Sequence, residues 1–263
     1  MKKVLSTLLV CMAVMSSCVN KEDQLGPDVP EETPTDTLNT EGKYACRLPE
    51  TTVNGKSAWV PGDQILIHGE LSQDQVIRTL TAADIDADGK TCYLSVDGVV
   101  PYIQEGVQSQ FTIAYPGELV DNAKKPKDKN KFSSTNAILM SGYMVDKEFV
   151  LEYIVGGFAF TVDGDIDSYV IRGNNGEVLG YESVTCRVTE SVKEYAQSVG
   201  KELKALKGSV VADGKTINHI CYPGDLDITA GFELVFYKGE TPVKTWYNED
   251  KHVSSRGSFT DLG

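Results

Sequence analysis

Short runs of alternating apolar and polar residues, separated by tight-turn dipeptides, constrain the fold of this chain more than any other feature. Residues 91–96 (TCYLSV) put cysteine, leucine and valine on one face and threonine, tyrosine and serine on the other, the period of a strand. Asn-Gly and Asp-Gly dipeptides, which tolerate the positive φ of tight hairpins, punctuate such runs. They stand at 54–55, 88–89, 97–98, 163–164, 175–176 and 213–214. The pattern predicts an all-β chain.

Further strands are predicted at 64–68, 110–115, 149–155, 158–162, 169–172, 232–237 and 243–247. One segment, 191–207, follows a different period. Its apolar residues recur at helical spacing, namely Val192, Tyr195, Val199, Leu203 and Leu206. Ser191 and Glu194 fit a capping box, and Gly208 is placed to end a helix. We therefore predict a single short helix in the second half of an otherwise β fold.

The strand-rich part of the chain, 43–263, is longer than one small sandwich requires, so we predict two tandem domains, 43–146 and 147–263, with a boundary near Asp146. Two short sequences occur in both halves. Ala-Asp-Gly-Lys-Thr stands at 87–91 and 212–216, and Tyr-Pro-Gly stands at 115–117 and 222–224. Their different internal spacing indicates similar turn chemistry rather than a repeat.

The first residues predict export. Two lysines precede a short apolar run that ends in Met-Ser-Ser-Cys, so residues 1–17 are predicted to be a removable signal peptide. Residues 15–18 (Met-Ser-Ser-Cys) resemble the lipobox of bacterial lipoproteins, which implies that Cys18 becomes the lipidated first residue of the mature protein. The alternative is an ordinary secretory signal with an incidental Cys18. Residues 18–42 hold prolines and acidic residues but few apolar groups, and are predicted to be a disordered tether.

The charge of the chain argues against nucleic acid as a partner. With 38 acidic and 25 basic residues, the formal net charge is −13. Affinity for nucleic acid comes largely from basic side chains on phosphates, which such a chain repels.

Four cysteines follow the tether: Cys46, Cys92, Cys186 and Cys221. An oxidising envelope permits disulfides, and bridges Cys46–Cys92 and Cys186–Cys221 would each stay within one predicted domain. The alternative is four buried free thiols that pack as small apolar side chains. Their spacing fits no zinc site, and we predict no metal site and no cofactor.

No catalytic motif is evident, so we predict no catalytic residues and expect that the chain is not an enzyme. The acidic segment 84–89 starts like a calcium loop, but Ser95 stands where the loop needs a bidentate glutamate, which favours a hairpin turn. The acidic residues at 163, 165 and 167 are interpreted in the same way. Acidic pairs are plentiful, and an envelope hydrolase with two catalytic carboxylates is a third hypothesis.

Residues 59–65 (WVPGDQI) resemble the Trp-x-x-Gly-Asp-x-Ile signature of fimbrillin-like lipoproteins, the type V pilus subunits of Gram-negative gut and oral bacteria. Further short motifs of that family follow in its order, at 114–116, 139–142, 149–151, 158–162, 169–173, 178–180 and 256–262. The resemblance covers most of residues 43–263. It implies two Greek-key β-sandwich domains of transthyretin-like topology.

The resemblance also implies a function and a place in the cell. It implies a palmitoylated outer-membrane lipoprotein at the cell surface, acting in cell adhesion as a pilus (fimbrial) subunit or accessory adhesin. Its partners would be other pilus subunits, the same or related, and a surface receptor or glycan. In the family, an Arg-directed protease removes the first strand, and a neighbour's strand fills the exposed groove, which is a form of β-strand addition.

Carried onto this chain, the processing candidate is Arg47, the first arginine of the sequence. Pro49 and Cys46 lie close to it and count against cleavage. The alternative is an ordinary strand arginine that points at solvent. A rival function is glycan binding, with Trp246, Tyr247 and Tyr102 as stacking platforms. Trp59 precedes a predicted strand and is expected in the core instead.

Overall fold

The computed structural model describes residues 38, 40–50, 54–69, 75–102, 111–121, 130–134, 136–188 and 193–263, with side chains described for all of these except 187–199. Residues 36–263 form one compact unit. The described part of the chain contains 19 strands and two short 3₁₀ turns, η1 (Ala82–Asp84) and η2 (Gly117–Leu119), and no α-helix. The all-β prediction is therefore confirmed. The predicted signal peptide, Cys18 and most of the tether lie outside the described residues.

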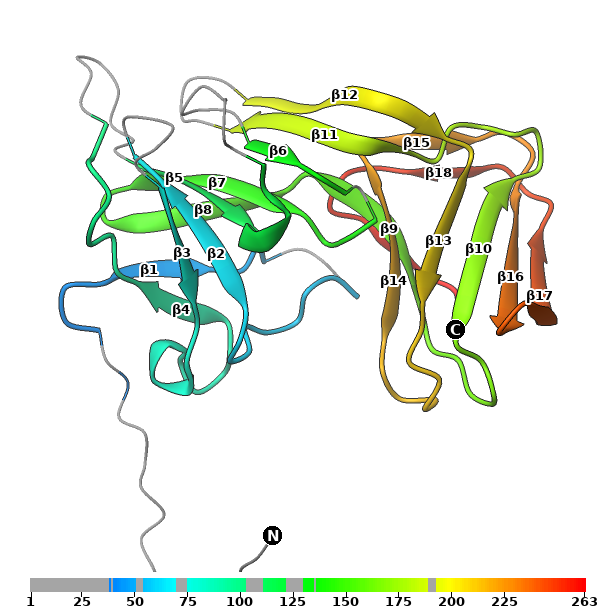
Figure 1. Ribbon diagram of the computed structural model, residues 1–263, viewed down its shortest axis with the longest axis horizontal. Coiled ribbons are helices and arrows are strands. Elements are labelled where there is room, and N and C mark those ends of the chain that lie inside the picture. The colour runs from blue at the N-terminus through cyan, green and yellow to red at the C-terminus, as the bar shows by residue number, and fades with distance from the viewer. Residues whose placement is uncertain are drawn as a thin grey trace, which may run out of the picture. The chain divides into compact units, whose positions relative to one another are not determined.

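The first half of the compact unit forms a seven-stranded sheet. Its members are β1 (Tyr44–Arg47), β2 (Gln64–His68), β3 (Gln75–Thr79), β4 (Thr91–Leu94), β5 (Thr112–Tyr115), β7 (Met140–Val145) and β8 (Glu148–Tyr153). They are arranged in the order β3-β2-β5-β7-β8-β1-β4 (Figure 1). Every neighbouring pair is antiparallel except β1 and β8, which run parallel. β1 therefore lies beside β8, a strand that follows it by about a hundred residues in the sequence.

The remaining strands form smaller sheets. One has the order β12-β11-β6, from β6 (Asn130–Phe132), β11 (Gly180–Val188) and β12 (Lys193–Leu203). A second has the order β13-β10-β16-β17, from β10 (Ser168–Gly173), β13 (Ala205–Ser209), β16 (Phe232–Lys238) and β17 (Thr241–Asn248). A third has the order β14-β9-β19, from β9 (Val155–Phe160), β14 (Asn218–Pro223) and β19 (Phe259–Asp261). The last is the pair β15 (Leu226–Ile228) and β18 (His252–Ser254).

The predicted hairpin chemistry accounts for several of these connections. Gly89 and Gly214 adopt φ of +71° and +67°, a region that glycine enters without the penalty of a Cβ. Within the first of these turns, the Gly89 amide donates to the Asp86 carbonyl and the Asp86 amide to the Thr91 carbonyl. The acidic segment before Gly89 is therefore a turn leading into β4, as its sequence predicts.

Two hydrophobic clusters form the core. The first packs beneath the seven-stranded sheet and includes Trp59, whose side chain is 2% exposed, together with Ile65, Ile67 and Phe149. The second lies between the β9 and β16 sheets. There Phe160 of β9 meets Phe236 of β16 with ring centroids 5.6 Å apart. Two facing sheets with aromatic side chains between them are the layer arrangement of a β-sandwich. The core position expected for Trp59 is also confirmed.

The predicted helix at 191–207 is wrong, because this segment contains β12 and β13 instead. Tyr195, Val199 and Leu203 are spaced by four residues, which fits one face of a helix and is also twice the period of a strand. Gly200 lies in this segment at φ +90°, a conformation foreign to a helix. The antiparallel pairing of β12 with β11 along most of its length outweighs local helix propensity.

The two-domain division stays a prediction. Asp146, where the boundary was placed, lies with Lys147 in the tight turn between β7 and β8, at φ of 47° and 68°. Both strands belong to the seven-stranded sheet. Val155 and Ala159 of β9 belong to the first cluster, which also includes Cys186 and Cys221, whereas Phe158 and Phe160 of the same strand belong to the second. β9 therefore contributes side chains to both clusters.

Candidate functional site: the first strand and the pocket at its end

The first strand, β1, is enclosed by its neighbours on both backbone edges. It pairs antiparallel with β4, where Cys46 faces Cys92, and parallel with β8, where Cys46 faces Phe149. The side chains alternate as the sequence demands. Cys46 and Leu48 are 0% and 5% exposed, while Arg47 between them points outward. β1 therefore lies inside the seven-stranded sheet, one place from its β4 edge.

Side-chain contacts add to the backbone pairing of β1. The indole Nε1 of Trp59 donates to the carbonyl oxygen of Cys46 at 3.2 Å, in a buried position. Tyr44 packs edge-on against Phe149, with ring centroids 6.4 Å apart. Just before the strand, Lys43 forms an ion pair with Asp84 at 2.6 Å. Together, these contacts hold the start of the strand and its residue Cys46.

The ion pair with Lys43 affects the titration of Asp84. Partial burial of that carboxylate would raise its pKa, but hydrogen bonds from Lys43 and Thr81 outweigh burial and hold the pKa below its usual value. Asp84 therefore carries its charge at neutral pH and retains the lysine at the entrance to β1.

Trp59 is itself held by a polar cluster. Its ring packs edge-on against Tyr115, with centroids 5.3 Å apart. The Tyr115 hydroxyl donates to Asp63 at 2.9 Å, and Lys56 pairs with the same carboxylate at 2.9 Å. Burial and the nearby Asp63 charge raise the pKa of Tyr115, which keeps its hydroxyl protonated as a donor. These contacts hold the Trp59 ring in place, and Trp59 in turn anchors β1 through its hydrogen bond to Cys46.

Arg47, the predicted processing residue, is the last residue of β1. Its side chain is 58% exposed and forms an ion pair with Glu148 at 3.8 Å. An exposed pair of this length contributes little to stability. The backbone is less accessible, because Arg47 is paired with both Thr91 and Val150, and the Leu48 amide donates to the Lys90 carbonyl at 3.0 Å. A protease could therefore read the side chain but would reach the peptide bond only after the end of β1 opens.

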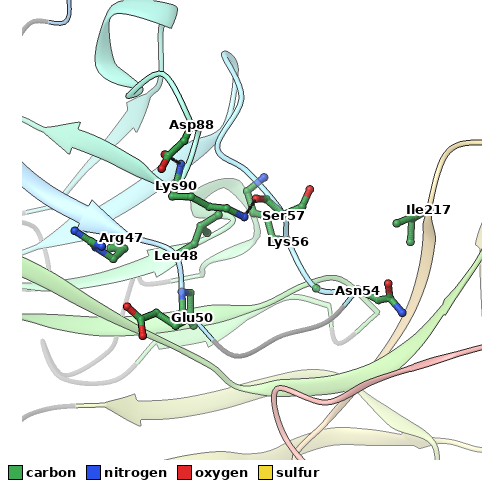
Figure 2. A pocket seen from close by; sticks show the side chains of 11 residues that line it. Arg47, Leu48, Glu50, Asn54, Lys56, Ser57, Asp88, Lys90 and Ile217 are labelled. Carbon is green, nitrogen blue, oxygen red and sulfur yellow. Dashed lines mark hydrogen bonds between the residues drawn. The ribbon is translucent and has the colours of Figure 1, made fainter.

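A pocket of about 410 Å³ lies where β1 ends (Figure 2). It is lined along the chain leaving β1 by Arg47, Leu48, Pro49 and Glu50, and across from it by Asn54, Gly55, Lys56, Ser57, Asp88, Lys90 and Ile217. Figure 2 shows Lys90 reaching the backbone oxygen of Ser57. Three cationic side chains (Arg47, Lys56 and Lys90) and two anionic ones (Glu50 and Asp88) are among the residues that line this pocket.

All four cysteines predicted to be bridged or buried are buried free thiols in the structure. Cys46 and Cys92 lie directly opposite each other, whereas Cys186 and Cys221 lie on β11 and β14, in different sheets. Burial raises the pKa of Cys186 to about 12 and raises that of Cys221 as well. Burial, followed by the neighbouring Cys46 thiol, raises the pKa of Cys92. Whether any pair is oxidised in the cell stays a prediction.

The proposed stacking residues do not share one platform. Trp246 and Tyr247 are neighbours on β17, so their side chains leave opposite faces of the strand. Trp246 packs against Phe236 with centroids 5.0 Å apart, and the Lys244 ammonium covers its ring at 4.7 Å. Tyr247 is 69% exposed. Both residues line a shallow hollow of about 480 Å³.

Tyr102, the third proposed stacking residue, is half-buried and lies between β4 and β5, in the half of the chain that forms the seven-stranded sheet. Trp246 and Tyr247 belong instead to the sheet that contains β10 and β16. The three aromatic residues predicted for glycan stacking therefore come from separate elements.

Neither a metal-binding cluster nor a membrane-spanning helix is present in the described residues. Among them, no three or more His, Cys, Asp and Glu side chains gather in a way that could hold a metal ion. Within the same ranges, no helix has the length and apolar character needed to span a membrane.

Sequence reasoning located Arg47 but missed the surroundings of β1. The apolar alternation of Tyr44, Cys46 and Leu48 is the signal that could have identified this strand. The hydrogen bond from Trp59 and the parallel pairing with β8 depend on the fold and have no local signal.

Comparison with known proteins adds little to this description. No known protein family matches the chain, and no curated protein matches it. Among solved structures, it is similar to a protein from Bacteroides uniformis ATCC 8492 to which a role in cell adhesion has been ascribed. The two chains are 14% identical with a TM-score of 0.42, over 83% of this chain and 99% of the other. The likeness is too distant to carry a functional argument, which therefore rests on the site.

Proposed function

We propose that this chain is a fimbrillin-like lipoprotein of the outer membrane surface, a pilus subunit or accessory adhesin that assembles by strand exchange. The supporting observation is the place of β1. It is a short strand with neighbours on both sides, and its last residue is the exposed Arg47. The signal-like first residues and the ordered fimbrillin motifs support the same proposal. We further propose that the chain has no enzymatic activity.

Physical chemistry explains how loss of β1 would drive assembly. Its removal leaves the facing backbone edges of β8 and β4 without partners and opens the space filled by Cys46 and Tyr44. Each unpaired backbone group that stays out of water costs about 1–3 kcal/mol. An extended strand from a second subunit would satisfy those groups, as strands do when they add to an open sheet edge.

Limited proteolysis tests this proposal. A chain from residue 18 onward, with Cys18→Ala to prevent lipidation, is treated with an Arg-specific protease under reducing conditions and followed by intact mass and native gel electrophoresis. We expect cleavage after Arg47, release of the preceding fragment, and a ladder of oligomers. Arg47→Lys keeps the charge and should resist this cut, while Arg172→Lys, which changes an exposed strand arginine elsewhere, should be processed normally. A chain that stays uncut, or is cut and remains monomeric, would contradict strand exchange.

Glycan binding is the second candidate, and the exposed Tyr247 beside the hollow at β17 supports it. Stacking of a sugar ring needs an uncovered aromatic face. Tyr247 offers such a face, whereas the ring of Trp246 is covered by Lys244. Tyr247→Ala should therefore abolish polysaccharide binding in an affinity gel if this function is real, and Trp246→Phe should not. Equal mobility of all three proteins with and without polysaccharide would exclude it.

A further inference from the structure

The buried thiols of Cys46 and Cys92 face each other across two strands. Their residues are directly opposite partners in the antiparallel pairing of β1 with β4, and both side chains are 0% exposed. Directly opposite residues in such a pair have Cα atoms about 4.5–5.5 Å apart. A disulfide spans Cα separations of about 4.4–6.8 Å. The register of the two strands therefore places the Cα atoms of these cysteines within the range that a disulfide spans.

We propose that Cys46 and Cys92 form an intrachain disulfide that staples β1 to β4. No competing arrangement is favoured by the fold. Cys186 and Cys221 belong to sheets that contain neither β1 nor β4. The side chains of directly opposite residues share one face of the sheet, so the two sulfur atoms meet without reorientation of either strand.

The bond forms by two thiol–disulfide exchange steps with an oxidant that is itself a disulfide, such as the oxidised form of an envelope thiol oxidoreductase. The thiolate of one cysteine attacks the donor disulfide, forms a mixed disulfide and releases one donor thiol. The second thiolate attacks the mixed disulfide, forms the Cys46–Cys92 bond and releases the second donor thiol. Two protons leave the cysteines, and the donor gains the two electrons.

Burial determines when this reaction occurs. In the folded chain, the environment of Cys92 disfavours the thiolate that exchange requires. Oxidation therefore takes place during folding, while β1 and β4 are still accessible. Once formed, the bond is enclosed by the core, so a soluble reductant reaches it only when β1 opens, as after a cut at Arg47 or on heating. The staple is a property of the folded chain rather than a freely reversible switch.

The consequence for assembly rests on the proposed function. A cut after Arg47 breaks the backbone beside the staple, but Cys46 remains attached to Cys92, so β1 stays in its groove. Strand exchange then requires two events, cleavage and reduction. Cys46 stands one residue before the cleavage candidate, which makes the bond a control on the release of this strand.

Peptide mapping tests the staple directly. The chain is expressed with its signal peptide in an oxidising envelope, denatured without reductant, alkylated and digested. We expect a peptide containing Cys46 to be linked to one containing Cys92, and Cys186 and Cys221 to be alkylated. Alkylated Cys46 and Cys92, or a link from either to another cysteine, would overturn the proposal.

Stability provides a second readout that needs no mutation. The bond would close a loop of about 46 residues, and its reduction should lower the melting temperature by roughly 10 °C. Cys46→Ala and Cys92→Ala should each remove the sensitivity to reductant, while Cys221→Ala should retain it. A melting temperature of the parent chain that is the same with and without reductant would contradict the staple.

Arg-specific cleavage of the same preparation separates this proposal from the proposed function. Without reductant, we expect a cut chain whose intact mass increases by one water, and with reductant we expect the fragment to leave. If the Cys46 and Cys92 peptides are linked but the chain is never cut, the disulfide proposal is supported and the pilus function is contradicted. If oligomer ladders form without reductant, the disulfide proposal is contradicted and strand exchange is supported.

Discussion

Replacing Trp59 by phenylalanine should loosen β1 more than the loss of a few ring atoms suggests. The Trp59 indole donates a buried hydrogen bond to the backbone of Cys46 at 3.2 Å, and phenylalanine cannot donate it. A lost hydrogen bond of this kind costs about 1 kcal/mol net. The smaller ring also gives up roughly 40 Å² of buried apolar surface, or about 1 kcal/mol. We expect the free energy of unfolding to fall by about 2 kcal/mol.

Two measurements check this expectation. Global stability is followed by thermal unfolding, and for a body of this size the melting temperature should fall by about 4–8 °C. The hydrogen bond acts on β1 itself, so the local opening of residues 44–48 should increase about fivefold, which hydrogen exchange of the amides reports. The control is Trp246→Phe, in a half-buried ring that packs against the second cluster. It should cost less, and it should leave exchange in β1 unchanged.

One outcome would refute the reasoning. If Trp59→Phe lowers the melting temperature but exchange at residues 44–48 rises no more than in the control, Trp59 is an ordinary core residue. The anchor of β1 would then have to be sought in the pairing with β4 and β8.

Two other predictions concern the sheet and the pH dependence of stability. Gly142→Ala should destabilise the fold by about 3 kcal/mol or more, because a Cβ would lie 2.0 Å from the backbone oxygen of Val150. Gly98→Ala, in an open turn at φ +78°, should cost only about 1 kcal/mol, and urea unfolding compares the two. Burial lowers the pKa of His219 and also that of His252. The unfolded chain then binds protons more readily, so stability should be lost as pH falls through about 6.5, and His219→Gln should reduce that loss. A stability that does not change between pH 7.5 and 5.5 would contradict the prediction.

Several of the strands were predictable because their signals are local. Residues 64–68 contain a short apolar run and form β2 at the predicted bounds, and the Asp-Gly turn at 88–89 leads into β4 as its residues require. Local signals failed at 191–207, where apolar residues four apart satisfy both a helix and a strand. The pairing with β11 decided the outcome there.

The candidate site was predictable only in part. Arg47 stood out as an arginine near the end of the tether, and its outward position is consistent with its polarity. The parallel neighbour β8 is separated from β1 by about a hundred residues, so no local pattern specifies that pairing. The opposition of Cys46 and Cys92 likewise depends on register, which is fixed by the whole sheet.

The central claim is that the place of β1 can be filled by a strand from another molecule. It is tested most directly with chain cut after Arg47, freed of its N-terminal fragment under denaturing and reducing conditions, and refolded with a synthetic peptide of residues 40–47. The account predicts saturable binding of one peptide per chain, with renewed protection from hydrogen exchange in β4 and β8. A peptide with Cys46→Asp should bind far more weakly, because that side chain enters the core. The account would be contradicted if the refolded body does not bind the peptide, or if it binds the parent peptide and the Cys46→Asp peptide equally.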